Sequence, residues 1–225
     1  MAGIHFDDIA PHYDFLNHFL SLHIDKRWRK KSLEKYIDSR TGCVLDVACG
    51  TGDFAIDCSK AGAKQVIGVD VSSKMVELGN RKIVDRKLAE KIDLRVGDCA
   101  NLEFSDEKFD AVIVAFGVRN FEEREKSLCE IFRVLRSSGR VIILEFSMPK
   151  RFPIRQLYSF YFKHILPFIG GLISGNKAAY VYLPDSVCAF PAPDDFMDEL
   201  RQVGFGEVAM HPFSFGIAVA YYGIK

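Results

Sequence analysis

The sequence of 225 residues predicts an α/β fold with a mostly parallel sheet and helices on both faces. Five short apolar runs in the middle of the chain indicate buried strands, because parallel strands are covered on both sides. Stretches with helical spacing separate these runs, and such alternation builds parallel βαβ units. The first run also leads into a glycine-rich turn and then a helix. The predicted strands are 43–47, 66–69, 92–96, 111–116 and 141–146, and the predicted helices between them are 53–60, 73–85 and 122–136.

Further elements are expected at both ends of the chain. The first 40 residues read as helices, and an aromatic stretch over 152–173 is interrupted by prolines and by a glycine pair. That stretch is too interrupted to span a membrane as one helix. The remaining expected elements are an amphipathic helix over 25–37, a helix over 194–203 and an antiparallel strand pair near 206–212 and 215–222 that closes the sheet.

Two boundaries carry local signals. Ser72 and Ser73 are expected to cap the helix 73–85, because a serine hydroxyl accepts a hydrogen bond from an unpaired N–H of the first turn. Ser138-Gly139 is expected to form a turn before the fifth strand.

Composition excludes several classes of protein. Lys plus Arg equals Asp plus Glu at 30 each, so no field that would attract nucleic acid is expected. None of the six cysteines has the C-x-x-C spacing of a zinc or redox site, and we expect them to be reduced. Four of the six histidines, His12, His18, His23 and His164, form no tight pair on one helical face, so no metal site is expected. The first residues lack the pattern of a signal peptide, which favours a cytoplasmic protein.

The strongest local signal is the loop in Val44–Asp53, where a strand runs into Gly50-Thr51-Gly52 and a helix follows. Glycines allow a sharp turn and close approach to a ligand, and the helix offers unpaired N–H groups. The loop also fits the dinucleotide pattern G-x-G-x-x-G/A. Asp70 lies 70 − 50 = 20 residues beyond Gly50, where a carboxylate can bind the ribose of either NAD or S-adenosylmethionine.

Charge separates these two ligands. A pyrophosphate prefers N–H groups and cations, whereas Asp46 precedes this loop and Asp53 follows it. Two acids suit the sulfonium and ammonium groups of S-adenosylmethionine, although Asp53 can instead be a simple favourable charge at a helix N-terminus. Asp98 follows the third strand, where it can accept a hydrogen bond from an adenine amino group, and Cys99 would lie close to the same ring.

These pieces resemble the class I methyltransferases, which use S-adenosylmethionine. The resemblance is carried, in order, by VLDVACGTGD, VIGVDVS, VGDCANLEF, FDAVIVAFGVRN and RVLRSSGRVIILEF. It implies a Rossmann-like class I methyltransferase fold: a mostly parallel seven-stranded sheet with helices on both faces and an antiparallel C-terminal strand.

A narrower resemblance covers nearly the whole chain. The motifs FDDIAPHYDFLNHFLSLHIDKRWR, FGVRNFEE, ILEFSMP and YVYLPDSVCAFP look like those of the menaquinone and ubiquinone C-methyltransferases. The loop VACGTGD is nearer to the demethylmenaquinone methyltransferase branch. The resemblance implies one domain with four parts: an N-terminal helical lid (1–40), a cofactor-binding core (41–147), a substrate-covering helical insertion (148–192) and a C-terminal helix and strand pair (193–225).

The resemblance also implies which residues bind the cofactor. The family's contacts fall on Thr51, Asp70, Asp98 and Cys99, and the loop argument adds Asp46, Gly50, Gly52 and Val71. The family often has Ser where this chain has Ala115, so either a hydroxyl contact is missing or the backbone serves instead.

The implied reaction moves a methyl group to a ring carbon of demethylmenaquinol. The acceptor must be the reduced quinol, and a phenol has a pKa near ~10, so a nearby cation should favour the phenolate. Arg119 is the leading candidate because it follows the fourth strand at the ligand-binding edge. Asn120 can hold the hydroxyl or a water, and Tyr13 is expected to close over the substrate.

Partners and rival functions follow from the same reading. The prenylated naphthoquinol has an isoprenoid tail that residues 152–173 are expected to cover, and the cluster Arg27-Trp28-Arg29-Lys30-Lys31 can meet anionic lipid headgroups at the inner face of the membrane. A homodimer is left open. The rivals are an NAD-dependent oxidoreductase, a non-catalytic subunit of a quinone-synthesis complex, and a methyltransferase acting on a benzoquinol of the ubiquinone route.

Overall fold

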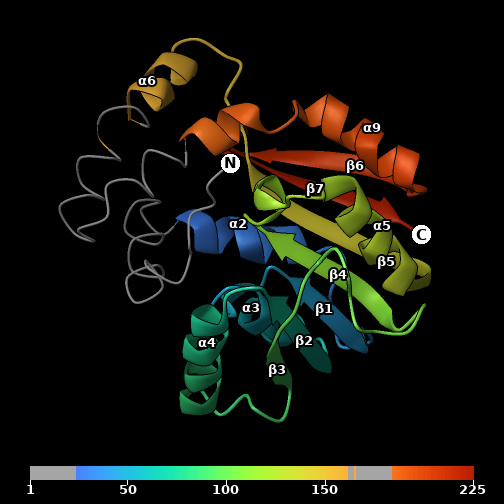
Figure 1. The fold of residues 1–225 in the computed structure, drawn as a ribbon. Helices are drawn as coiled ribbons and strands as arrows, with labels where there is room; N and C mark the ends of the chain where they lie inside the picture. The colour runs from blue at the N-terminus through green and yellow to red at the C-terminus, as the bar shows by residue number, and fades with distance from the viewer. Residues whose placement is uncertain (1–23, 162–164, 166–183) are drawn as a thin grey trace.

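Figure 1 shows the fold in a computed structural model, which describes residues 24–161, 165 and 184–225. Tyr13 lies outside the described residues, as do most of the expected lid over 1–40 and part of the expected insertion over 148–192. The predicted core over 41–147 and the predicted C-terminal part over 193–225 are described throughout.

Seven strands form one sheet in the order β3-β2-β1-β4-β5-β7-β6. Strands β1 to β5 pair in parallel, and β7 pairs antiparallel with both β5 and β6. This confirms the predicted seven-stranded, mostly parallel sheet with a reversed strand at the end of the chain. The strands are β1 (Cys43–Val47), β2 (Gln65–Asp70), β3 (Ile92–Val96), β4 (Phe109–Ala115), β5 (Leu135–Phe146), β6 (Gly206–Phe213) and β7 (Ala218–Ile224).

The last two strands differ in burial, and this explains their order in the sheet. Most side chains of β7 are buried, whereas most of those of β6 are exposed. A strand that is covered on both faces and paired on both sides carries a nearly continuous apolar sequence, which AVAYYGI provides. The final strand therefore lies between β5 and β6, and β6 forms the edge.

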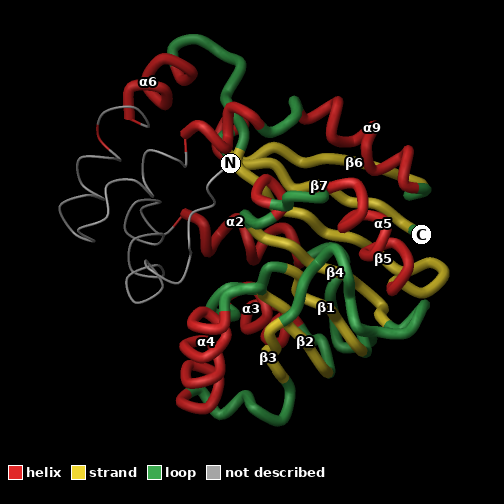
Figure 2. Tube along the Cα trace, viewed as in Figure 1, coloured by secondary structure: helices red, strands yellow, loops and turns green. Residues whose placement is uncertain are grey.

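Helices cover both faces of the sheet, as Figure 2 shows with the strands in yellow. Apolar residues of α2, α3 and α4 pack with Val44, Val66 and Ile142 on one face. Residues of α5 and α9 pack on the opposite face with Leu45 and Ile143. Of the helices in the described ranges, none combines the length and the hydrophobicity needed to cross a bilayer. The helices are α2 (Ile24–Leu33), α3 (Asp53–Ala61), α4 (Ser73–Asp85), α5 (Arg124–Val134), α6 (Ile154–Phe160) and α9 (Pro193–Val203), with short 3-10 helices η2 (Val118–Asn120) and η4 (Ser214–Gly216).

The beginning of β5 departs from the sequence prediction. The expected strand over 141–146 starts at Leu135, and the expected turn at Ser138-Gly139 is an irregularity inside it. The register with β4 moves from Phe109 opposite Leu135 to Ala111 opposite Arg140. Ser138 has a left-handed φ of 64° and its N–H donates to the Lys225 carbonyl at 2.8 Å. The extra residues therefore form a bulge that binds the end of β7.

Two local features fix α4 beside the glycine-rich loop. Ser72 is the N-cap, and its hydroxyl accepts the N–H of Met75 at 3.2 Å, which confirms one of the two expected caps. Gly79 allows the helix to approach closely, because a Cβ there would lie 3.0 Å from the Thr51 carbonyl carbon and 2.5 Å from a methyl of Leu94. Helix α4 therefore packs directly against the backbone of the glycine-rich loop at Thr51.

Replacing Ser72 by Ala should lower the free energy of unfolding by about 1 kcal/mol, because the Met75 N–H loses its acceptor in the first turn. The matched control is Ser73→Ala at the next, exposed position, where we expect a change below about 0.5 kcal/mol. Urea unfolding of both variants measures the difference. Equal losses at the two positions would show that Ser72 does not act as a cap.

Candidate functional site

The glycine-rich loop joins β1 to α3 at the carboxyl edge of the sheet. Gly52 is the residue before α3 and has a left-handed φ of 79°, and Gly50 has a φ of 53°. Residues other than glycine are strained at such angles. A Cβ added to Gly50 would meet nothing within 4 Å. The loop thus turns sharply and leaves open space beside Gly50, as a ligand-binding loop requires.

Asp70 ends β2 and holds this loop in place. Its Oδ2 accepts the N–H of Gly50 at 2.7 Å, and its Oδ1 accepts the N–H of Ser72 at 2.9 Å. The Asp70 carboxylate thus joins the loop to the start of α4. The neighbouring Val71 exposes 66% of its surface, which makes it an apolar contact available at the same edge.

Asp46 lies in β1 on the face that α3 covers, and only 1% of its surface is exposed. The N–H of Ala55 donates to its carboxylate, and burial raises the pKa of this carboxyl well above its usual range. The nearby charge of Asp70 raises it further. Among the described residues, the Asp46 Oδ2 atom has no hydrogen-bond partner. A cation beside this oxygen would offset part of the pKa shift.

A network of charges surrounds the start of α3. Lys82 of α4 donates to the hydroxyl of Thr51 at 2.8 Å and to Asp53 at 3.0 Å. Arg29 of α2 is buried, and it contacts Asp25 at 2.6 Å, Asp57 at 2.8 Å and Asp53 at 3.4 Å. Asp53 is therefore an ion-pair partner within the fold. Of the two roles considered for Asp53, this fits the favourable charge at a helix N-terminus better than direct contact with a ligand.

Asp98 and Cys99 follow β3, as predicted, but their side chains differ in exposure. Asp98 is exposed, and its Oδ1 accepts the N–H of Ala100 at 2.8 Å. The Cys99 Sγ lies 3.3 Å from the Ser127 hydroxyl on α5, and burial raises the pKa of this thiol. The Cys99 side chain thus points toward α5 and stays a neutral thiol. A ligand at this edge would meet the Asp98 carboxylate.

Arg119 lies in η2 after β4 and is bound to Glu145 of β5. The side chains of Arg119 and Glu145 are 7% and 0% exposed, and Arg119 Nη1 donates to Glu145 Oε1 at 2.9 Å. The Arg119 backbone N–H donates to the second Glu145 oxygen at 3.1 Å. Arg119 also donates to the Phe116 carbonyl through Nη1 and to the Ser186 hydroxyl through Nε at 3.2 Å.

These bonds use three of the five guanidinium N–H groups of Arg119. In the described part of the chain, the two N–H groups of Nη2 donate no hydrogen bond. Asn120 follows in the same short helix, and its backbone N–H donates to the Gly117 carbonyl at 2.9 Å. The structure therefore brings the predicted Arg119 and Asn120 together, and it gives Arg119 a carboxylate partner that was not expected.

An aromatic cluster lies against the Arg119 guanidinium. The rings of Phe116 and Phe146 stack with centroids 4.3 Å apart, and Trp28 of α2 lies 6.5 Å and 6.3 Å from them. The Arg119 Cζ atom lies 5.6 Å from the centroid of the Phe146 ring. Ala115, which stands where the family that the sequence resembles often has serine, also packs against this cluster. The cluster therefore places aromatic rings directly beside the Arg119 guanidinium.

Sequence reasoning missed three charged residues of this site: Glu145, Lys82 and Arg29. Glu145 had a detectable signal, because a carboxylate inside the apolar run IILEF is costly unless it is paired. Lys82 and Arg29 lie on amphipathic helices among other charges, and the sequence does not distinguish them from exposed residues. Among the described residues, no group of His, Cys, Asp or Glu could hold a metal ion.

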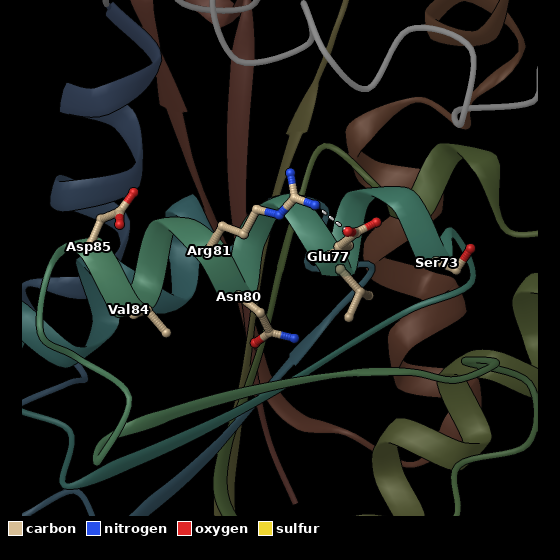
Figure 3. A pocket seen from close by; sticks show the side chains of 7 residues that line it. Ser73, Glu77, Asn80, Arg81, Val84 and Asp85 are labelled. Carbon is tan, nitrogen blue, oxygen red and sulfur yellow. Dashed lines mark hydrogen bonds and ion pairs between the residues drawn. The ribbon is translucent and has the colours of Figure 1, made fainter.

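A separate groove runs along the outer face of α4, shown in Figure 3. Its lining consists of Ser73, Val76, Glu77, Asn80, Arg81, Val84 and Asp85. Glu77 and Arg81 form an ion pair one helical turn apart. None of the predicted cofactor residues lines this groove, so it is separate from the loop described above.

Comparisons with known proteins agree with this geometry. The model of the ubiE/COQ5 methyltransferase family matches residues 2–225. A demethylmenaquinone methyltransferase of Bacteroides fragilis is 43% identical over 221 residues, covering 98% of this chain and 90% of that protein. A ubiquinone/menaquinone biosynthesis C-methyltransferase UbiE of Geobacter sulfurreducens is 45% identical over 222 residues, covering 98% and 86%.

The fold has solved counterparts at lower identity. The crystal structure of a SAM-dependent methyltransferase from Aquifex aeolicus superposes with a TM-score of 0.62 at 17% identity, covering 87% of this chain and 88% of that one. At this identity the likeness supports the class I methyltransferase fold alone. The family model covers nearly the whole chain, and the relatives match it from end to end. The chain therefore belongs to the ubiE/COQ5 methyltransferase family.

Proposed function

We propose that this protein methylates a ring carbon of demethylmenaquinol with S-adenosylmethionine as the methyl donor. The observation that carries the proposal is the 43% identity, over 98% of the chain, to a relative named demethylmenaquinone methyltransferase. The geometry supports it independently, because the loop has open space at Gly50 and the buried Asp46 Oδ2 has no hydrogen-bond partner among the described residues. Both features fit a ligand that approaches the backbone closely and carries positive charge.

Three carboxylates have distinct roles in holding the methyl donor. Asp70, at the end of β2 and bonded to the Gly50 N–H, would accept hydrogen bonds from the ribose hydroxyls. Asp46 would face the positive end of the donor, directly or through a water. The exposed Asp98 would accept the adenine amino group, with Val71 in contact with the ring. The backbone of Gly50, Thr51, Gly52 and Cys99 completes the set.

The methyl donor supplies an electrophilic methyl group, and the chain must therefore make the quinol ring carbon nucleophilic. A phenol with a pKa near ~10 becomes a better donor of electron density when its oxygen is ionised. Arg119 has two N–H groups on Nη2 for this oxygen, while Glu145, Phe116 and Ser186 fix the rest of its guanidinium. Because Glu145 neutralises the charge of Arg119, we assign the effect to directed hydrogen bonds more than to net charge.

The remaining predicted catalytic residues complete this proposal. Asn120, next to Arg119 in η2, would hold the second hydroxyl or a water that carries the proton away. Tyr13, outside the described residues, would cover the substrate. The expected location is the cytoplasm, at the inner face of the membrane, because the isoprenoid tail of the substrate belongs in the bilayer.

A second acceptor has its own support. The relative of Geobacter sulfurreducens, 45% identical, is named for both ubiquinone and menaquinone biosynthesis. A benzoquinol of the ubiquinone route presents the same reactive arrangement, a ring carbon beside an ionisable hydroxyl. The naphthoquinol and the benzoquinol differ by one fused ring, which the stacked Phe116 and Phe146 would contact.

The deciding assay measures methyl transfer from labelled S-adenosylmethionine to reduced demethylmenaquinone and to a reduced prenylated benzoquinol, side by side. We expect turnover with the naphthoquinol, and none when either quinone is left oxidised, because an oxidised ring carbon is not nucleophilic. Turnover with the benzoquinol alone would show instead that the protein methylates a benzoquinol of the ubiquinone route. Binding of S-adenosylmethionine without methyl transfer to either quinol would favour the rival function, a non-catalytic subunit of a quinone-synthesis complex.

The two sides of the site should separate in variants. Asp70→Ala should weaken binding of S-adenosylmethionine by about 10-fold to 100-fold, the range for a hydrogen bond to a charged group. Arg119→Lys keeps a positive charge beside Glu145 but removes the two Nη2 donors, so kcat should fall about 100-fold while the Kd for S-adenosylmethionine stays within about twofold. Calorimetry and steady-state kinetics measure both quantities. A matched loss of cofactor affinity in the two variants would contradict this division.

The buried ion pair should also matter for folding. Glu145→Gln should lower the free energy of unfolding by about 3 kcal/mol, because it leaves the Arg119 charge buried without a carboxylate. The control is Glu199→Gln, since Glu199 pairs with Arg124 through two bonds in a much more exposed setting. There the expected loss is about 1 kcal/mol or less. Denaturant unfolding compares the two, and similar losses would show that burial does not determine the cost.

A further inference from the structure

Exposed aromatic side chains gather around α6 and the turn between β6 and β7. In the described chain, three phenylalanines are exposed: Phe152 by 81%, Phe215 by 74% and Phe160 by 59%. Leu157 of α6 is exposed by 65%. A single exposed apolar residue is ordinary, whereas a group of large ones marks an interaction surface. Figure 1 shows α6 standing clear of the helices that cover the sheet.

Contacts place the two segments side by side. The Ser147 N–H donates to the Ile217 carbonyl at 2.9 Å, and a Cβ at Gly216 would lie 4.0 Å from the Cα of Pro149. On its inner side, α6 buries Tyr158 in a cluster that includes Phe146 and Ile217. The exposed residues of the two segments therefore border one surface, which we call the α6 rim: Phe152, Leu157, Phe160 and Phe215 with Lys150, Arg151 and Arg155.

The backbone of the turn that carries the exposed Phe215 is strained. Ser214, Phe215 and Gly216 have left-handed φ angles of 46°, 60° and 90°. A bulky residue in this region is a genuine outlier, and such strain persists where the surroundings impose it. Here Trp28 Nε1 donates to the Ser214 hydroxyl at 3.0 Å and holds the turn from the side of α2.

The charge of the α6 rim is one-sided. Lys150, Arg151 and Arg155 are exposed, and an ion pair between Lys150 and Asp194 spans 3.6 Å. From residue 147 to residue 161 the described chain contains Lys150, Arg151 and Arg155 and no Asp or Glu. The whole chain has a formal net charge of zero, so the positive charge is a local feature.

The nearby face of α2 is basic as well. Of the cluster considered in the sequence, Trp28 and Arg29 are buried, while Arg27, Lys30 and Lys31 are exposed. The contact between Trp28 and Ser214 joins α2 to the turn that carries Phe215. The exposed cations of α2 therefore lie on the helix whose Trp28 is bonded to this turn.

We propose that the α6 rim docks on the surface of an anionic phospholipid bilayer. Apolar side chains would enter the boundary between headgroups and acyl chains, and the cations would meet the phosphates. A second copy of the chain fits poorly, because two rims face to face would bring their cations together. The inner side of α6 packs near Phe146, which contacts Arg119, so docking would place the active edge next to the bilayer. This last consequence rests on the proposed function, whereas lipid binding does not.

The test is co-sedimentation of the full chain with sucrose-loaded vesicles of phosphatidylcholine alone or with added phosphatidylglycerol. We expect binding to the anionic vesicles at least tenfold stronger than to the neutral ones.

The variant F152S/L157S/F160S should lower the partition constant at least tenfold, and K150E/R151E/R155E should abolish the preference for anionic lipid. Matched controls are V84S/V96S, at two exposed valines, and R86E/K87E/K91E, at exposed cations far along the chain. We expect these to bind within twofold of the unchanged protein.

Several outcomes would overturn the proposal. They are no binding of the unchanged protein to anionic vesicles, equal losses in the rim variants and their controls, and conversion of a dimer to a monomer in F152S/L157S/F160S with no change in vesicle binding. Thermal unfolding and calorimetry with S-adenosylmethionine verify that each variant is folded. Turnover of a detergent-dispersed quinol is measured for the unchanged protein and for the control variants V84S/V96S and R86E/K87E/K91E, where we expect no change. Absence of turnover in every protein, with normal vesicle binding, would count against the proposed function alone.

Discussion

The loops of the candidate site depend on one constraint, the parallel direction of β1, β2, β3, β4 and β5. Parallel strands all end at the same edge of a sheet, so loops that are distant in sequence meet there. The hydrogen bond from Gly50 to Asp70 is the direct expression of this constraint, because it joins the loop after β1 to the end of β2. The pairing of β4 with β5 does the same for Arg119 and Glu145. Without this common edge, the same residues would lie apart and could not form a site.

Burial of charge gives this edge its chemical character. Arg119 with Glu145, and Arg29 with its three aspartates, are ion pairs in places where water is largely excluded. Charges in such places persist only with well-placed partners, and those partners also fix the geometry. Asp46 is the contrasting case, since its carboxyl is buried with one oxygen unsatisfied and a strongly raised pKa. Among the described residues, the Asp46 Oδ2 atom thus has no hydrogen-bond partner, and it belongs to the strand that leads into the loop with open space beside Gly50.

Much of this arrangement could be predicted from the sequence where the signal is local. The helix 73–85 and the strands 43–47 and 92–96 have the predicted bounds, because a serine cap and short apolar runs are decided by nearby residues. The beginning of β5 could not be predicted, since its bulge exists only through contact with Lys225. The partner of Arg119 was missed for a similar reason. Glu145 is 26 residues away, and only the register of two strands brings the two together.

The place of β7 has a consequence for the order in which the chain can assemble. In the described sheet, β6 is joined to the other strands only through β7, although β6 comes first in the sequence. During synthesis, β6 therefore has no strand of this sheet to pair with until β7 has been made and inserts beside β5. Pro212 in β6 suits that interval, because a proline offers no N–H through which the strand could pair with a wrong neighbour.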